Sequence, residues 1–137
     1  MRILLDTNIL ISALISRGGP AARLFDAWMD DDAFTLLMSE VQLTELRRVM
    51  DYDHIKKLTD PVRVEEYLRN LDTACMVEGH VTIDASIDPD DNLILGAAVA
   101  GKADLIVSRD EKHMLVLGEI QGIPIVNAVD AIKRLQV

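Results

Sequence analysis

Short apolar runs alternate with amphipathic stretches along this chain of 137 residues. Such runs are typical of strands that are buried on both faces of a parallel sheet. Apolar residues spaced three and four apart are typical of helices that bury one face. The predicted strands are Arg2–Leu5, Phe34–Met38, Leu105–Ser108 and Pro124–Val126, with Val81–Ile83 as a short edge strand.

Capping residues mark where the helices begin. Ser39, with Gln42 three residues later, forms a capping box for a helix over Glu40–Met50. Asp60 and Asp88 each precede a proline, which favours the first helical position. The helix after Asp88 ends at Gly101. The first predicted helix runs from a cap at Thr7 or Asn8 to about Ile15, and the last runs from a cap at Asn127 to about Leu135. Three more helices are predicted over Ala21–Met29, near His54–Leu58 and over Asp110–Leu117.

Strands and helices in alternation imply a mostly parallel sheet with right-handed crossovers. The length of the chain fits one domain. We therefore expect an α/β fold, with three α/β/α layers around a mostly parallel central sheet, formed by residues 1–137 as a single domain. The helix-rich stretch over residues 39–77 is expected to form a lobe beside that sheet.

Four acidic residues fall where such a sheet collects its loops. Asp6 and Asp110 each come just after a predicted strand, Asp91 opens an apolar helix, and Glu45 interrupts the apolar face of another. Open parallel sheets bind ligands at the carboxyl ends of their strands. Carboxylates gathered there repel one another unless a hard divalent cation holds them. The pattern predicts metal-dependent chemistry on a phosphate ester.

The two acids at the strand ends, Asp6 and Asp110, each have a structural role as an alternative to metal binding. Asp6 can be a helix N-cap, although Thr7 or Asn8 can supply that cap equally well and leave Asp6 free. Asp110 can simply open a helix. Ser108 can hydrogen-bond a ligating carboxylate or a phosphate oxygen, which favours a supporting role for it.

The two helical acids also have structural alternatives. Glu45 lies at the border of the buried stripe, where a charge is costly unless it is paired or bound to a metal. An ion pair with Arg47 or Arg48 explains it as well as a ligand role does. Asp91 follows the cap Asp88 and complements the helix dipole. The apolar helix behind Asp91 nevertheless holds it near the sheet.

Other polar residues carry no such signal. Asp30–Asp32 closes an amphipathic helix, and a solvated turn explains it. Cys75 continues the apolar spacing of the helix after Asp60 and is expected to be a core residue rather than a nucleophile. No zinc-like spacing relates the three histidines, His54, His80 and His113.

Composition limits the classes of function. The longest apolar stretches are too short for a membrane span, and the single cysteine allows no internal disulfide, so we expect a cytoplasmic protein without membrane contact. The net charge of −9, from 14 Lys+Arg against 23 Asp+Glu, argues against tight sequence-blind binding to long duplexes. A transient or structured single-stranded RNA, or a basic protein partner, fits better.

The motifs together resemble the PIN-domain family. The matching blocks cover nearly the whole chain: Leu4–Leu10, Ser39–Glu45, Asp88–Ala97 and Ile106–Asp110. The stretch Ala13–Trp28, with its Gly18-Gly19-Pro20, is similar to toxins of the VapC kind from type II toxin–antitoxin systems. Relatives often carry another acid where this chain has His113, and small residues where it has Arg109.

The resemblance implies a Mg²⁺- or Mn²⁺-dependent ribonuclease whose metal-binding and catalytic acids are Asp6, Glu45, Asp91 and Asp110, with Asn8 and Ser108 in support. In-line attack of a metal-activated water is expected to leave 5′-phosphate and 3′-hydroxyl ends. It also implies an RNA substrate, a cognate antitoxin protein and a homodimer. Candidate phosphate-binding cations are Arg47, Arg48, Arg109 and Lys112.

Two other functions compete with this one. A phosphatase of the haloacid-dehalogenase kind also places an Asp after the first strand, but it needs a second Asp where this chain has Asn8. A non-catalytic module that keeps the fold to bind a partner is the other alternative. The presence of all four acids argues against it.

Overall fold

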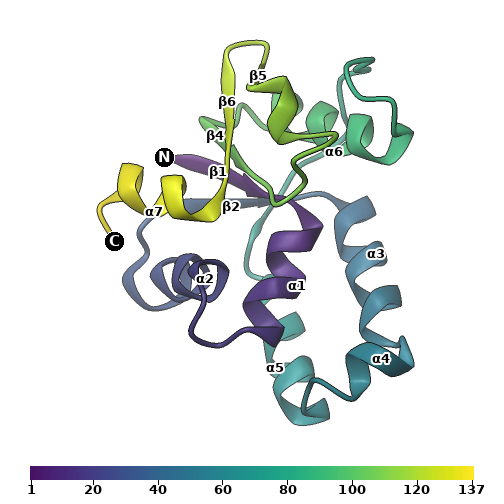
Figure 1. Ribbon diagram of the computed structural model, residues 1–137, viewed down its shortest axis with the longest axis vertical. Helices are drawn as coiled ribbons and strands as arrows, with labels where there is room; N and C mark the ends of the chain where they lie inside the picture. The colour runs from purple at the N-terminus through teal and green to yellow at the C-terminus, as the bar shows by residue number, and fades with distance from the viewer.

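The computed structural model describes residues 1–137 and is built around one six-stranded sheet (Figure 1). The strand order is β3-β2-β1-β4-β6-β5, and only the pairing of β5 with β6 is antiparallel. The strands are β1 (Arg2–Leu5), β2 (Thr35–Met38), β3 (Cys75–Met76), β4 (Leu105–Val107), β5 (Glu119–Ile120) and β6 (Ile123–Val126). The predicted α/β fold with a mostly parallel sheet is confirmed.

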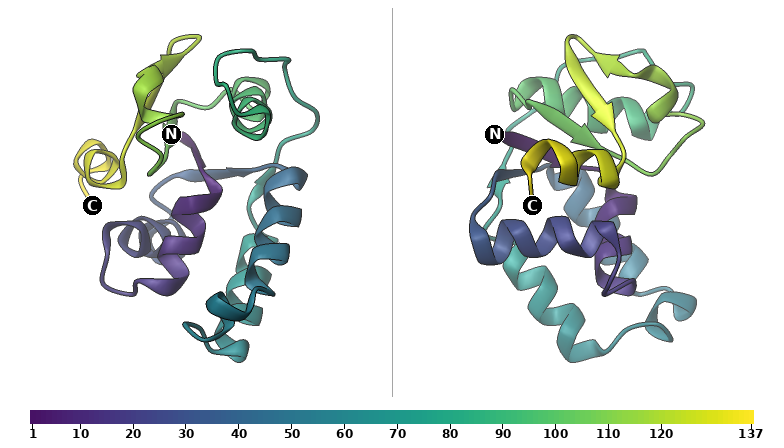
Figure 2. Two further views of the ribbon diagram at one scale, coloured as in Figure 1. Left: turned by 45° about the vertical axis from the view of Figure 1, so that its right-hand side comes forward. Right: turned by 60° about the vertical axis from the view of Figure 1, so that its left-hand side comes forward.

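Helices cover both faces of the sheet, as the two views of Figure 2 show. Because side chains alternate along a strand, Ile3 and Leu5 join one apolar cluster with α1, α2, α3, α5 and α7, whereas Leu4 joins another with α6. The helices are α1 (Thr7–Ile15), α2 (Pro20–Asp31), α3 (Glu40–Met50), α4 (Asp53–Lys56), α5 (Pro61–Leu71), α6 (Pro89–Ala100) and α7 (Ala128–Leu135), with a 3₁₀ turn η1 (Leu115–Leu117). None of them is long and apolar enough to cross a membrane.

The centre of the sheet positions the candidate site. The chain leaves β1 toward β2 on one side and leaves β4 toward β6 on the other, so the strand order reverses between β1 and β4. Loops that diverge at such a point open a crevice at the carboxyl ends of the strands. Asp6 and Ser108 are the first residues beyond these two strand ends.

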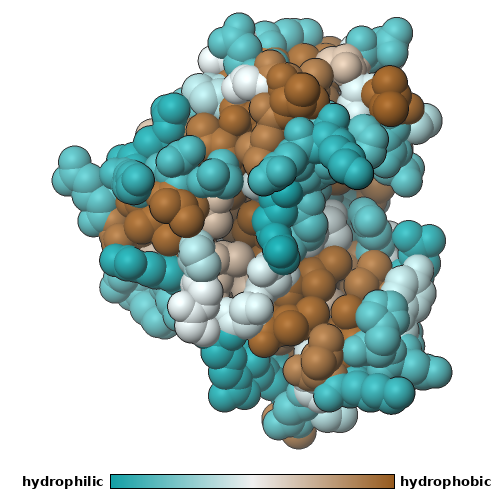
Figure 3. Space-filling model, viewed as in Figure 1, coloured by the Kyte–Doolittle hydropathy of each residue, from teal (hydrophilic) through white to brown (hydrophobic).

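The stretch between β2 and β3 is almost entirely helical. In Figures 1 and 2, α3 leaves the carboxyl end of β2, α4 turns the chain, and α5 returns toward the sheet. The predicted capping box is present, because the Ser39 hydroxyl accepts from the Gln42 N–H and the Gln42 amide oxygen accepts from the Ser39 N–H. Figure 3 shows apolar surface where α1 adjoins α3.

Two predictions at the sheet edge are wrong. Val81–Ile83 forms no strand, and the edge strand is instead Cys75–Met76, which pairs with Leu37 and Met38. The predicted core role of Cys75 also fails, because α5 ends at Leu71 and the Cys75 side chain is exposed. Helical spacing that runs past the end of a helix carries no information about burial, because a strand follows a different period.

The predicted helix Asp110–Leu117 is also wrong. The Asp110 carboxylate accepts the backbone N–H groups of Lys112 and His113 as a helix N-cap does, but the chain then forms turns over residues 111–114 and only the short η1. A capping pattern shows where a helical turn can start and does not set how far it continues. The hairpin of β5 and β6 was not predicted either; Gln121 and Gly122, both with positive φ, form its turn.

The segment before α6 crosses that helix at very close range. The Val81 N–H donates to the Gly96 carbonyl over 3.1 Å, and a Cβ on Gly96 would fall on the Val81 carbonyl oxygen. Gly96→Ala is therefore expected to lower the free energy of unfolding by about 2 kcal/mol through overpacking, as chemical denaturation would measure. Gly18→Ala, with open space around the new Cβ, is the matched control. Equal stability of both variants would contradict the close packing.

Candidate active site

Asp6 has two structural roles at the carboxyl end of β1. Its backbone N–H donates to the Val107 carbonyl (2.8 Å) and extends the pairing with β4. Its Oδ1 accepts the Thr7 N–H (2.8 Å), so Asp6 itself is the N-cap of α1. The predicted cap at Thr7 or Asn8 is therefore wrong, because α1 begins directly after Asp6, the first residue beyond the strand, and Thr7 is already helical. Asp6 is 4% exposed.

Ser108 connects Asp6 to the loop after β4. Its buried hydroxyl donates to Asp6 Oδ2 over 2.7 Å and accepts the Asp110 N–H over 3.1 Å. Asn8 makes a second connection, because its amide donates to Asp6 Oδ2 (3.3 Å) and its carbonyl oxygen accepts the Arg109 N–H (3.2 Å). These hydrogen bonds hold the ends of β1 and β4 in one rigid group.

Glu45 reaches the same region from α3. The Gln42 side chain, which is fully buried, donates to the Leu5 carbonyl (2.7 Å) and holds the first turn of α3 against β1. Glu45 lies about one turn after Gln42 on α3, and its Oε2 accepts a hydrogen bond from the Thr7 hydroxyl over 3.3 Å. Glu45 forms an ion pair with neither Arg47 nor any other cation, so the structural alternative for it is absent.

Asp91 approaches from the first turn of α6. Asp88 caps this helix through the Asp90 N–H, as predicted, which leaves the Asp91 carboxylate free of that role. Asp91 is 9% exposed, and the hydroxyl of Ser86 donates to its Oδ2 over 3.3 Å. The carboxylate has no cationic partner among the ion pairs.

Asp91 and Asp110 form a compact group with His113. One ligand atom from each of the three side chains lies within 4.8 Å of the other two, and His113 Nδ1 lies 3.2 Å from Asp110 Oδ2. The sequence placed His113 where relatives often carry another acid, but it assigned no role to this residue. A histidine three residues after a candidate ligand on a strand-end loop is a second signal for it.

The local electrostatics agree with this arrangement. Burial, opposed by the hydrogen bonds from Ser108 and Thr7 and increased by the nearby charges of Asp91 and Glu45, raises the pKa of Asp6 to about 6. Burial, together with nearby carboxylates that include Asp110, also raises the pKa of Asp91. The raised pKa values indicate that no nearby positive charge compensates the ionised forms of these two acids.

Asp110 behaves differently from these two. Burial tends to raise the pKa of its carboxyl group, but the hydrogen bonds from His113 and Lys112 outweigh it and lower that pKa. Asp110 therefore stays ionised over a wide pH range and offers a negative charge to any cation that enters. The structure thus places Asp91 and Asp110 in one group and connects Asp6 to Asp110 through Ser108. The charges of Asp91 and Glu45 act on Asp6, and Glu45 contacts the neighbouring Thr7.

A family model described as the PIN domain matches residues 2–112. The chain belongs to the PIN domain family. PIN domains are nucleases, a class of hydrolases. Among solved structures, a chain of VapBC2 from Rickettsia felis, crystallised bound to a DNA fragment from its promoter, has the same fold: the TM-score is 0.65 and the identity 18%, over 93% of this chain and 98% of that one. A comparison with curated protein sequences gave no match.

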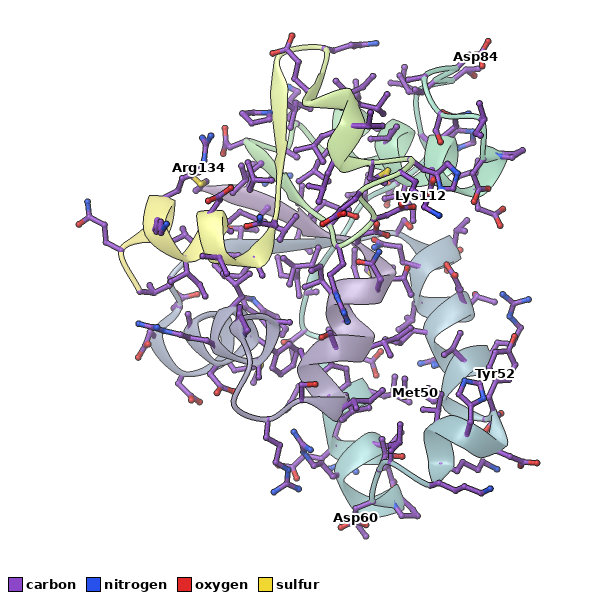
Figure 4. The ribbon with its side chains drawn as sticks, viewed as in Figure 1. Met50, Tyr52, Asp60, Asp84, Lys112 and Arg134 are labelled. Carbon is purple, nitrogen blue, oxygen red and sulfur yellow. The ribbon has the colours of Figure 1, made fainter.

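The four candidate cations of this PIN domain differ in position. Arg109 and Lys112 lie on the loop after β4, where Figure 4 marks Lys112, and the Arg109 guanidinium donates to the Ser12 hydroxyl (3.1 Å). Arg48 lines a depression of about 500 Å³ together with Glu45 and Asp90. Arg47 forms an ion pair with Asp72 at 3.6 Å, so it is a weaker candidate than the other three for binding phosphate.

The donor set of the PIN domain fits a divalent cation. Carboxylate oxygens from Asp6, Asp91 and Asp110 are the ligands that Mg²⁺ and Mn²⁺ accept. The raised pKa values of Asp6 and Asp91 mean that their surroundings disfavour the ionised carboxylates, and a nearby cation would favour them. The hydroxyls of Ser108 and Ser86 hold one oxygen of each carboxylate in place, as supporting residues do at metal sites.

Proposed function

We propose that this PIN domain is an endoribonuclease that depends on Mg²⁺ or Mn²⁺. The observation that carries the proposal is the convergence of Asp6, Asp91 and Asp110 at the reversal of strand order, two of them with raised pKa values and none paired with Lys or Arg. Asp6 and Asp91 bind the principal cation, and Asp110 and Glu45 complete the site. A cation held there lowers the pKa of a water ligand and offsets the charge that develops on phosphate.

The side chains have separate tasks in the proposed hydrolysis. Water attacks phosphorus in line, a new P–O bond forms, and the bond from phosphorus to the 3′ oxygen breaks. Glu45, whose Oε2 is held by Thr7, accepts a proton from the attacking water. The departing 3′ oxygen takes a proton from solvent, so the products carry a 5′-phosphate and a 3′-hydroxyl. Arg109 and Lys112 bind flanking phosphates.

The phosphatase alternative fits the structure less well. Its chemistry needs an acid at the place of Asn8, and the Asn8 amide here donates to Asp6 Oδ2. An amide bound in this way holds the carboxylate in position but cannot transfer a proton. A failure to trap a phospho-aspartate with a small phosphate ester is therefore expected.

Labelled RNA tests the proposal directly. The purified chain should cut single-stranded RNA internally when Mg²⁺ or Mn²⁺ is present, and a chelator should abolish cleavage until metal is restored. Analysis of the ends should find 5′-phosphate and 3′-hydroxyl groups. Cleavage that persists in chelator would contradict the metal dependence. Cleavage of single-stranded DNA but not RNA would contradict the substrate class.

Ser108→Ala tests whether the hydroxyl supports the metal site. The variant loses the donor to Asp6 Oδ2 and the acceptor for the Asp110 N–H. Loss of such a supporting contact is expected to weaken metal affinity by about tenfold or more, as calorimetric titration would measure. Ser16→Ala, on the exposed C-cap of α1, is the control. Unchanged affinity in Ser108→Ala would remove Ser108 from the site.

A protein partner belongs to the same proposal. The similar solved structure is a complex that includes VapBC2 and promoter DNA, and the acidic site offers a target for an arginine-bearing antitoxin segment. We propose that a cognate antitoxin inhibits the enzyme and that the chain forms a homodimer. Co-expression with the protein encoded by the adjacent reading frame, followed by size-exclusion chromatography with light scattering, tests both. A monomer that gains no partner would contradict them.

A further inference from the structure

The loop after β4 folds His113 back over Asp110. The His113 N–H donates to Asp110 Oδ1 over 3.0 Å, and its ring Nδ1 lies 3.2 Å from Asp110 Oδ2. The turns at 111–114, which replace the expected helix, produce this approach. The side chain is about one-third exposed, so the ring borders the site and remains accessible to solvent.

The separations in this group match those around a single ion. Two ligand atoms bound side by side to an octahedral ion at roughly 2.1 Å lie about 3 Å apart, and opposite ligands lie about 4.2 Å apart. The His113–Asp110 distance of 3.2 Å and the limit of 4.8 Å for the whole group, which includes Asp91, lie close to these values. Two segments of the chain, the first turn of α6 and the loop after β4, therefore bring two oxygens and one nitrogen within 4.8 Å of one another.

The ring also has unused bonding capacity. Its only side-chain hydrogen bond joins Nδ1 to Asp110, and Nε2 has no hydrogen-bond partner in the protein. The nitrogen that lies beside the Asp110 carboxylate is Nδ1, and it is the nitrogen that the measured separations favour as the ligand. A cation between Nδ1 and Asp110 Oδ2 would replace the single contact between them, and no other hydrogen bond of the ring would be lost.

Donor type distinguishes the candidate ions. Mg²⁺ strongly prefers oxygen ligands and retains several waters. Imidazole nitrogen binds first-row transition ions more strongly, with affinity that increases from Mn²⁺ toward Cu²⁺. The addition of one imidazole to the carboxylates of the site therefore makes it discriminate against Mg²⁺ in a way that carboxylates alone do not.

We propose that His113 is a direct metal ligand and makes the site prefer Mn²⁺ over Mg²⁺. This inference rests on the proposed function, since it assigns a further ligand to the same cation site. It gives His113 a role in the choice of cofactor, separate from any role in the cleavage step. The relevant measurement is therefore metal binding rather than activity.

Electron paramagnetic resonance with MnCl₂ as the probe tests the ligand directly. Wild-type protein should bind Mn²⁺ with nitrogen-14 spin-echo modulation typical of coordinated imidazole, and Mg²⁺ should compete poorly. His113→Ala should lose the modulation and bind Mn²⁺ more weakly by at least about tenfold, with a smaller change for Mg²⁺. His113→Asp should restore binding without modulation and with a lower preference for Mn²⁺. His80→Ala, an exposed histidine elsewhere, should behave as wild type.

The possible failures are distinguishable. Mn²⁺ that binds wild-type protein without nitrogen modulation, or with modulation that persists in His113→Ala, overturns the role of His113 and leaves the proposed metal site standing. No Mn²⁺ binding to folded wild-type protein overturns the proposed site itself. Circular dichroism of each variant separates both results from loss of the fold, and His113→Asp provides a second folded variant if His113→Ala unfolds.

Discussion

Replacement of Asp6 by Asn is expected to reduce the RNA cleavage rate by roughly a thousandfold, because removal of one metal-binding charge sacrifices several kcal/mol of transition-state stabilisation. Asp6 is central because it contacts both sides of the site: Ser108 bridges it to the loop of Asp110, and its charge acts on Asp91 and Glu45. Asparagine keeps the shape and the N-cap acceptor but removes the charge. Single-turnover cleavage of labelled RNA at saturating metal measures the effect.

Asp84→Asn is the matched control for that experiment. Asp84 is exposed on the segment before α6, where Figure 4 marks it at the periphery of the molecule, far from β1 in the view. The same loss of one charge there should leave the cleavage rate within about twofold of wild type, since an exposed, distant charge is largely screened. Wild-type turnover by Asp6→Asn with an intact circular dichroism spectrum would reject the assignment of Asp6.

The sequence predicted the sheet and the strand-end acids because both follow from local patterns. Apolar runs marked β1 and β4, and capping residues marked α3, α5 and α6. Parallel strands place their carboxyl ends together, so Asp6 and Asp110 could be assigned to one edge from order alone. Asp91 followed from the buried helix behind it.

What the sequence could not predict depends on contacts between distant residues. Asp6 was expected to be free of the cap, but the hydrogen bond from its N–H to Val107 fixes it at the helix start. The position of His113 depends on the direction of the Asp110 carboxylate, which accepts the N–H groups of Lys112 and His113. The spacing of apolar residues contains no information about that direction. Cys75 continued the apolar spacing of α5, but that helix ends at Leu71 and Cys75 is exposed. Edge strands as short as β3 leave almost no pattern to detect.

The charge on Asp6 is also expected to destabilise the metal-free fold, in a manner that depends on pH. The pKa of Asp6 is about 6 in the folded state against 3.8 for the free group. A raised acid pKa means that the folded state binds the proton more tightly. The stabilisation is fully present below the unfolded pKa and is lost as the pH rises through the folded pKa. The ionised form of Asp6, which the proposed metal site would use, is therefore the form that the protein without a cation stabilises least.

A comparison of the two proteins across pH isolates this effect. The free energy of unfolding of metal-free wild type, minus that of Asp6→Asn, should rise by about 2 kcal/mol from about pH 7.5 to about pH 4.5, because only wild type can take up the proton. Subtraction removes the contributions of groups that titrate alike in both proteins, and the interaction between Asp6 and Asp91 stays within the difference. Urea denaturation in chelator measures each value. A flat difference for Asp6→Asn, or one that falls with acidification, would mean that Asp6 is not held in the desolvated, negatively charged surroundings from which its catalytic role is inferred.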